Sequence, residues 1–198
     1  MTTKLVGGWG INDLNIPARN PLYEKWKKMI YRCVLPHDKS YSKYGGAGVT
    51  ICPEWKNFSN FYQWASQYDW EGKEIDKDLL VNNNKIYSPN TCCFLSRPVN
   101  TFLTGLTHGS TNEYPPGVSL NPNQSKLKPY KAQCCDLTGR QKFLGRYKTP
   151  LEAYKAYVEY KSKLTLKYAL KENDLRIRKG LIRFANDLIE DYYYRESQ

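Results

Sequence analysis

The sequence predicts an α+β fold in two parts, because short strand patterns fall into groups that are each followed by a helical pattern. Apolar residues recur at helical spacing after Asn20-Pro21 and again after Thr149-Pro150. Short apolar and aromatic runs stand between glycine, asparagine and proline turns, which is typical of strands. We therefore expect a small strand–strand–helix module, then a three-stranded antiparallel sheet packed on a helix, then a C-terminal helix.

The composition indicates a protein that binds a polyanion. The 198 residues include 30 Lys and Arg against 19 Asp and Glu, a net charge of +11, and 17 tyrosines. With 40% apolar residues the chain can form cores, so we do not expect wholesale disorder. No apolar run approaches the ~18 residues of a membrane span, and no signal peptide follows Met1. We expect a cytoplasmic protein without a membrane partner; nucleic acid is the usual partner of such a chain, and a generic basic surface is the alternative.

The first part is expected over residues 21–103, after an N-terminal arm at 1–20. Asn20 and Pro21 are residues that favour the start of a helix, and Pro53 begins a second one. A glycine-rich turn before residue 49 leads to a short strand at 49–52.

The end of this part is predicted as strand, turn, strand and helix. Residues 74–80 form the first strand, and the Asn82–Lys85 loop turns the chain back into Ile86-Tyr87. A compact segment at 90–95 then leads to a helix at 97–103.

The second part is expected over residues 117–172, after a linker at 104–116. Strands are predicted at Val118–Asn121, Tyr130–Asp136 and Lys142–Tyr147. Thr149 and Glu152 form a capping box that starts the following helix. Residues 173–198 hold the C-terminal helix.

Positive charge concentrates between residues 117 and 148. This stretch has seven Lys and Arg against the single Asp136, so more than half of the net charge lies on three short strands and their loops. The major groove of DNA admits a β-ribbon, with Lys and Arg on phosphates and amide side chains on bases. The charge pattern therefore favours a sheet that docks on double-stranded DNA.

The six cysteines do not form a secreted disulfide framework, because the chain has no export signal. A zinc site is conceivable from four side chains: Cys33, His37, Cys52 and Cys92. The alternative is that these cysteines are small buried hydrophobic residues.

Residues 117–170 resemble the DNA-binding domain of plant Apetala/ethylene-response factors, which also occurs in phage homing endonucleases. The resemblance rests on Gly117-Val118, Tyr130–Ala132, Phe143–Tyr147 and Thr149–Tyr157. In that family one face of the sheet contacts DNA. Strand alternation assigns this role to Ser119, Asn121, Lys131, Gln133, Cys135, Gln141 and Phe143. The charge pattern adds Lys126, Lys128, Arg140, Lys142 and Arg146.

Residues 22–103 resemble the core of phage-encoded HNH endonucleases, the ββα-metal group. The carrying residues are Trp26, Arg32-Cys33, Tyr41, Tyr44–Val49, Cys52–Trp55, Ile75–Asp78, Tyr87–Pro89 and Asn100. This chemistry uses a divalent metal held by a carboxylate and an amide, a histidine base, and an asparagine that orients the base.

The resemblance gives four residues catalytic roles. Asp76 and Asn100 fall on the metal ligands, which implies Mg²⁺ or Mn²⁺. Lys77 stands at the position of the base histidine, and Thr91 at that of the orienting asparagine. A solvated lysine is a poor base, but protonated Lys77 could stabilise the charge of the transition state. The alternative is that Asp76, Asp78 and Asn100 belong to an inert, solvated hairpin.

The two resemblances together imply a metal-dependent DNA endonuclease of the phage homing type, as a monomer or a homodimer, in the host cytoplasm if it is phage-encoded. A second hypothesis is a catalytically degenerate, sequence-specific DNA-binding protein that acts as a transcriptional regulator. A third is a basic protein that captures a host protein without chemistry, and the charge of the sheet argues against it.

Overall fold

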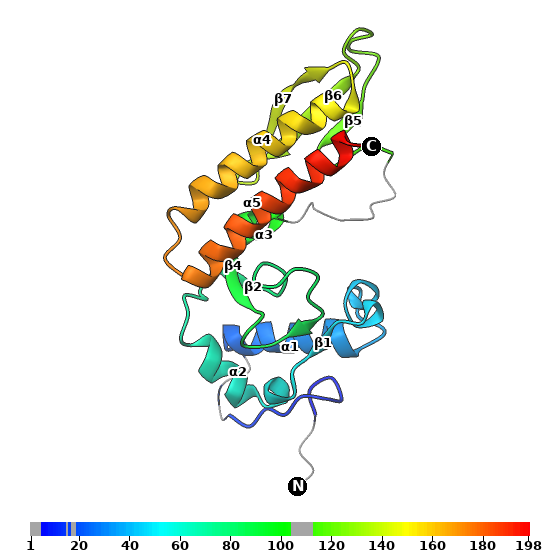
Figure 1. Ribbon diagram of the computed structural model, residues 1–198. Helices are drawn as coiled ribbons and strands as arrows, with labels where there is room; N and C mark the ends of the chain where they lie inside the picture. The colour runs from blue at the N-terminus through cyan, green and yellow to red at the C-terminus, as the bar shows by residue number, and fades with distance from the viewer. Residues whose placement is uncertain (1–4, 15, 17–18, 104–112) are drawn as a thin grey trace. The chain divides into compact units, whose positions relative to one another are not determined.

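The computed structural model describes residues 5–14, 16, 19–103 and 113–198 (Figure 1). The chain divides into two compact units, 1–96 and 97–198. Each unit has helices and small sheets, so the predicted α+β class is confirmed. The predicted linker lies mostly outside the described residues, since 104–112 are not described.

The helices of the first unit begin where the sequence predicts. Helix α1 (Pro21–Val34) is capped by Asn20, whose Oδ1 accepts hydrogen bonds from the N–H groups of Leu22 and Tyr23 at 2.9 and 3.2 Å. The helix expected from Pro53 is instead divided into the 3₁₀ turn η3 (Pro53–Lys56) and helix α2 (Phe58–Ala65), because Asn57 between them is extended. Two further 3₁₀ turns, η1 (Tyr41–Lys43) and η2 (Gly45–Ala47), precede the first strand.

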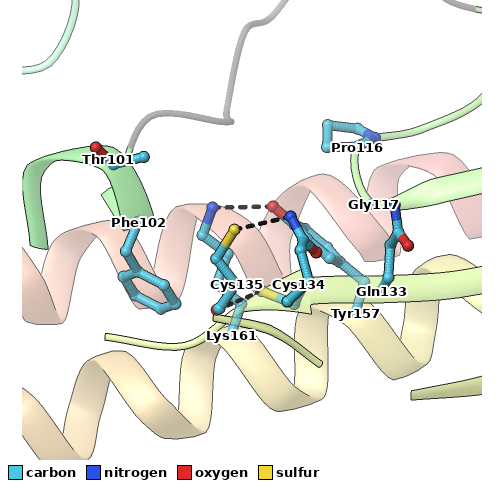
Figure 2. Close-up of a pocket in the computed structure, with 10 residues that line it drawn as sticks. Thr101, Phe102, Pro116, Gly117, Gln133, Cys134, Cys135, Tyr157 and Lys161 are labelled. Atoms are coloured by element: carbon cyan, nitrogen blue, oxygen red, sulfur yellow. Dashed lines mark hydrogen bonds between the residues drawn. The ribbon is translucent and has the colours of Figure 1, made fainter. Parts of the chain in front are cut away.

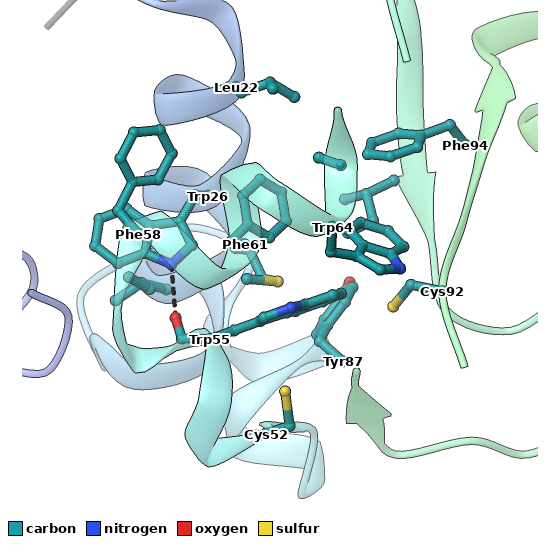
Figure 3. Packing of buried hydrophobic residues seen from close by; sticks show 14 of the residues in the cluster. Leu22, Trp26, Cys52, Trp55, Phe58, Phe61, Trp64, Tyr87, Cys92 and Phe94 are labelled. Carbon is teal, nitrogen blue, oxygen red and sulfur yellow. Dashed lines mark hydrogen bonds between the residues drawn. The ribbon is translucent and has the colours of Figure 1, made fainter. Parts of the chain in front are cut away.

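Large aromatic side chains fill the core of this unit (Figure 3). Trp26 and Trp55 are almost fully buried, and the indole Nε1 of Trp26 donates to the carbonyl of Trp55 at 2.7 Å. Trp55, Phe61 and Trp64 contact one another through their rings. The aromatic residues at helical spacing therefore form core, as their pattern predicts.

Two small sheets complete the first unit, and their pairing differs from the prediction. Strand β1 (Thr50–Ile51) pairs in parallel with β3 (Ile86–Tyr87), and β2 (Lys73–Asp76) pairs antiparallel with β4 (Cys93–Ser96). The predicted hairpin of 74–80 with 86–87 is therefore wrong. The reason is local, because the side chain of Asp76 accepts the N–H groups of Asp78 and Leu79 and ends the strand in a turn.

Residues 5–14, expected in an arm, pack on the first unit. The N–H of Ile11 donates to the carbonyl of Lys56 at 2.8 Å, and the N–H of Phe58 donates back to Ile11 at 2.9 Å. The carboxylate of Asp13 accepts from the backbone and hydroxyl of Ser59. These bonds hold the segment beside η3 and α2.

The second unit consists of α3 (Arg97–Leu103), the sheet β5 (Val118–Leu120), β6 (Tyr130–Cys135) and β7 (Gln141–Tyr147), and the helices α4 (Pro150–Ala169) and α5 (Leu175–Glu196). The sheet is antiparallel in the order β5-β6-β7 and packs against α4, as predicted. Thr149 and Glu152 form the predicted capping box. Asp174 caps α5 by accepting the N–H of Arg176.

The core of the second unit lies between the sheet, α4 and α5. Tyr154 and Val158 of α4 pack with Leu188 and Tyr192 of α5, and Phe102 of α3 joins the same cluster. Helices α3 and α5 are therefore built into this unit, whereas the sequence pattern assigned 97–103 to the first module and set 173–198 apart.

No helix in the described ranges is long and apolar enough to cross a membrane.

Candidate functional site

The sheet of the second unit has one face toward α4 and one face away from it. Ala132 and Cys134 of β6 are buried, and Cys134 belongs to the core cluster with α4. Lys131, Gln133 and Cys135 alternate with them and are half-buried. These three residues therefore lie on the face that points away from the helix, which we call the open sheet face.

A β-bulge in β7 decides which residues of that strand join the open sheet face. Arg146 stands opposite Lys131 and Phe143 opposite Gln133, so the register shifts between them and Leu144 has no partner. Gly145 absorbs this shift at φ +141°, a conformation that side chains disfavour. The shift gathers seven side chains on one face: Ser119, Lys131, Gln133, Cys135, Gln141, Phe143 and Arg146.

Hydrogen bonds hold parts of this face in place. Arg146 donates from Nη1 to the carbonyl of Asn121 at 3.4 Å and from Nη2 to the side-chain oxygen of Gln124. Gln141 donates from Nε2 to the sulfur of Cys135 at 3.0 Å. Phe143 is 57% exposed and adds an aromatic ring to this face.

The remaining predicted DNA contacts lie around the face. Lys126 and Lys128 are exposed in the loop between β5 and β6, and Arg140 is exposed in the turn between β6 and β7. Lys142 instead lies on the helix side, opposite Cys134, with its ammonium 4.8 Å from the ring centre of Tyr160. Charge alone singled out Lys142, and strand alternation separates it from the open sheet face.

Asp76 lies at the end of β2, opposite Cys93 of β4. Its Oδ1 accepts the N–H groups of Asp78 at 3.0 Å and Leu79 at 2.7 Å, and no described residue donates to Oδ2. Burial raises the pKa of Asp76; the charge of Asp78 also raises it, whereas the two backbone bonds and Lys77 lower it. A half-buried carboxylate with one unengaged oxygen fits a divalent-cation ligand.

Lys77 is buried inside the loop that follows β2. Its ammonium donates to the carboxylate of Asp78 and, at 3.2 Å, to the carbonyl of Asn84. The amide of Asn84 donates back to the carbonyl of Lys77 at 2.7 Å. These reciprocal bonds between Lys77 and Asn84 close the loop. The side chain of Lys77 therefore has a structural role, and its ammonium already donates to two acceptors.

Thr91 and Asn100 complete the predicted catalytic set. The hydroxyl of Thr91 donates to the carbonyl of Ile86 at 2.7 Å and lies 2.9 Å from the hydroxyl of Ser88, within the same loop. Asn100 is half-buried in α3 and belongs to the second unit, whereas Asp76 belongs to the first. The chain order is nevertheless strand β2, loop, antiparallel strand β4, then α3 directly after it.

Arg32 is a candidate that sequence reasoning did not assign a role. Its guanidinium lies over two rings, 4.6 Å from the centre of Tyr44 and 4.8 Å from that of Tyr87. Its Nε is buried and has no hydrogen-bond partner among the described residues. The charge of Arg32 lowers the pKa of the Cys92 thiol and the charge of Asp76 raises it. The position of Arg32 within the HNH resemblance is the signal that could have identified it.

The proposed zinc site, Cys33, His37, Cys52 and Cys92, does not form as a metal-binding group among the described residues. No three His, Cys, Asp or Glu side chains there form a metal-binding group. Burial raises the pKa of Cys33 and Cys52 to about 11 and that of Cys92 to about 12, which keeps the thiols protonated at neutral pH. Cys52 and Cys92 lie in the aromatic core (Figure 3), in agreement with the alternative of small buried hydrophobic residues.

Comparisons with family models, with curated proteins and with solved structures give no match to this chain. The two resemblances therefore stay predictions from the sequence.

Proposed function

We propose that this protein is a metal-dependent DNA endonuclease of the phage homing type, which docks on double-stranded DNA through the open sheet face. The observation that carries the DNA-binding part is the register of β6 and β7. It gathers two cations, two amides and an exposed aromatic ring on the face opposite α4. A set of this composition suits contact with phosphates and base edges.

The hydrolytic part rests on the first unit and on the order strand, loop, strand, helix. Asp76 has a carboxylate oxygen without a hydrogen bond and a pKa raised by burial, and a bound divalent cation would stabilise its charged form. The second ligand that the HNH resemblance implies is Asn100, which belongs to the second unit. Mg²⁺ or Mn²⁺ would polarise the phosphodiester and activate water. Arg32, whose guanidinium lies over two tyrosine rings, is a further cation of the first unit that would stabilise negative charge.

A second candidate is a catalytically degenerate DNA-binding protein, and the loop after β2 favours it. The ammonium of Lys77 is engaged by Asp78 and Asn84, so it is not poised to accept a proton from water. The hydroxyl of Thr91 is engaged within its own loop and does not orient a base.

Plasmid cleavage separates these candidates. We expect nicking or cutting by the full chain with Mg²⁺ or Mn²⁺, none with EDTA, and at least a hundredfold loss in Asp76→Asn. The amide oxygen of Asn can still accept the bonds from Asp78 and Leu79, so the turn is kept. Asp69→Asn, at an exposed carboxylate paired with Lys73, is the matched control and should cleave normally.

Duplex binding without metal-dependent cleavage would leave the DNA-binding regulator as the function. Absence of both binding and cleavage would remove both candidates.

A further inference from the structure

A pocket of about 280 Å³ opens in the second unit, where β6 continues beyond the start of β5 (Figure 2). Thr101 and Phe102 of α3 line one side, and Pro116 and Gly117 line another. The remaining lining residues are Gln133, Cys134, Cys135, Gln141, Tyr157 and Lys161.

Lys161 is the one charged side chain among these lining residues. It is buried, with only 2% of its surface exposed. Its ammonium donates to the hydroxyl of Tyr157 at 2.9 Å (Figure 2). The described part of the chain gives Lys161 no ion pair. Instead, the rings of Phe102, Tyr157 and Phe184 surround the ammonium at 5.2–5.4 Å from their centres.

Three ring faces stabilise a buried ammonium only in part, because they do not replace the solvation or the counter-ion that burial removes. A ligand with negative oxygens would supply that counter-ion within the pocket. The hydroxyl of Tyr157 and the amides of Gln133 and Gln141 are further donors on the walls. The pocket therefore combines a cation, neutral donors and apolar surface, with no acidic side chain among its lining residues.

We propose that this pocket binds a phosphoryl group, with Lys161 as its counter-charge. Gln133 and Gln141 belong both to the pocket wall and to the open sheet face, so the pocket opens beside the surface proposed to meet DNA. The choice of a phosphoryl group over a carboxylate rests on that proposed function. The group comes either from the backbone of bound DNA or from a free phosphate or phosphomonoester.

The test uses the full-length protein and two variants of the same helix. Lys161→Met removes the buried charge, and Lys163→Met removes an exposed charge two residues away. Inorganic phosphate is titrated into the protein at constant ionic strength. Binding is measured by calorimetry and by the shifts of the backbone amide NMR signals of residues 133–135. A short duplex is titrated separately by fluorescence anisotropy.

If the ligand is free phosphate, the wild type saturates at millimolar phosphate, Lys161→Met binds at least tenfold more weakly, and duplex affinity is unchanged. If the ligand is the DNA backbone, Lys161→Met weakens duplex binding about tenfold and lowers the salt slope by about one, while phosphate alone has no effect. In both cases Lys163→Met stays within about twofold of the wild type.

Equal behaviour of the two Met variants toward phosphate and duplex would overturn the proposal. If Lys161→Met does not fold, Tyr157→Phe decides, because it removes one pocket donor and keeps the ring: a several-fold weaker response supports the site, and an unchanged one rejects it. Lys161-dependent phosphate binding by a wild type that binds no duplex would keep this site and refute the DNA-binding function.

Discussion

Lys161 and Asp76 each carry a charge into surroundings that oppose it. Burial lowers the pKa of Lys161 to about 8 and raises the pKa of Asp76 above its ordinary value. Both shifts mean that the folded protein disfavours the charged form, and therefore that each charge costs stability at neutral pH. Residues that cost stability are frequent at functional sites, where the ligand compensates for the cost.

The pH dependence of stability tests the state of Lys161. Below pH 8 both the folded and unfolded chains hold its proton, and the folded chain bears the full cost of burial. Between about 8 and 10.5 the folded chain loses the proton first, so stability rises with pH. This difference between the folded and unfolded pKa of Lys161 corresponds to a loss of about 3 kcal/mol in the free energy of unfolding at neutral pH. A variant without the ammonium regains that amount but loses about 1 kcal/mol with the hydrogen bond to Tyr157.

We therefore expect urea unfolding of Lys161→Met to give about 2 kcal/mol more stability than the wild type at pH 7, and a smaller rise from pH 8 to 10. Lys163→Met provides the reference for removing one positive charge. Burial also raises the pKa of the neighbouring Cys134 thiol to about 11 and that of the Tyr157 hydroxyl, so neither group charges below pH 9. Parallel profiles in the wild type and Lys161→Met would show that Lys161 does not titrate as described.

Asp76→Asn is expected to keep or raise the stability of the fold. Because burial raises the folded pKa of the Asp76 carboxyl, the protein loses stability as pH rises from 3.8 through that pKa. The asparagine amide has no charge to bury and avoids this loss. The melting temperature at pH 7 should therefore be equal to or above that of the wild type. If Asp76→Asn instead lowered the free energy of unfolding by more than about 2 kcal/mol, the carboxylate would have a structural role in the turn to Leu79.

At the scale of elements, local signals were predictable and long-range pairings were not. The caps at Asn20 and Thr149 depend on residues within four positions, so the sequence alone indicates both helix starts. The pairing of β2 with β4 depends on contacts across the loop that contains Lys77 and Asn84, and a turn pattern at Asn82–Lys85 suggested the wrong partner. Local turn chemistry does not determine which strands meet.

The same distinction applies to the candidate sites. Strand alternation correctly placed Lys131, Gln133 and Phe143 on one face, because the bulge shifts only the part of β7 that follows Phe143. Joining Arg146 to that face requires the bulge, which no period-two pattern reveals. Helical spacing places Lys161 on the core side of α4, but no sequence pattern reveals that its ammonium is buried without an ion pair among the described residues.

The bulge at Gly145 is testable against a second glycine with positive φ. An alanine Cβ at Gly145 would lie 2.8 Å from the Tyr147 hydroxyl, whereas at Gly139 (φ +84°) it would meet nothing within 4 Å. Both Gly→Ala changes impose backbone strain of about 1–3 kcal/mol. Only Gly145→Ala should also disturb the open sheet face and weaken duplex binding at least tenfold, measured by anisotropy, with Gly139→Ala within about threefold. Equal losses in DNA affinity would remove the bulge from the recognition surface.

At the scale of the molecule, the distribution of charge predicts how DNA binding depends on salt. Seven Lys and Arg lie between residues 117 and 148 against one Asp, and Lys131 and Arg146 face outward on the open sheet face. Each phosphate that these cations neutralise releases counter-ions. With ~4–6 such contacts, the slope of log K against log salt should be about −3.5 to −5.5.

Lys131 and Lys142 lie on opposite faces of the same sheet. Comparing their effects on this slope tests which face of the sheet meets DNA. Lys131→Met should reduce the slope by about one and weaken binding for all sequences alike, because it removes an outward cation. Lys142→Met removes the same charge on the helix side, over the ring of Tyr160, and should change the slope by much less. The measurement is anisotropy of a labelled duplex between 50 and 200 mM salt. A larger effect from Lys142 than from Lys131 would mean that DNA approaches the edge or the helix side, since net charge is equal in the two variants and only position differs.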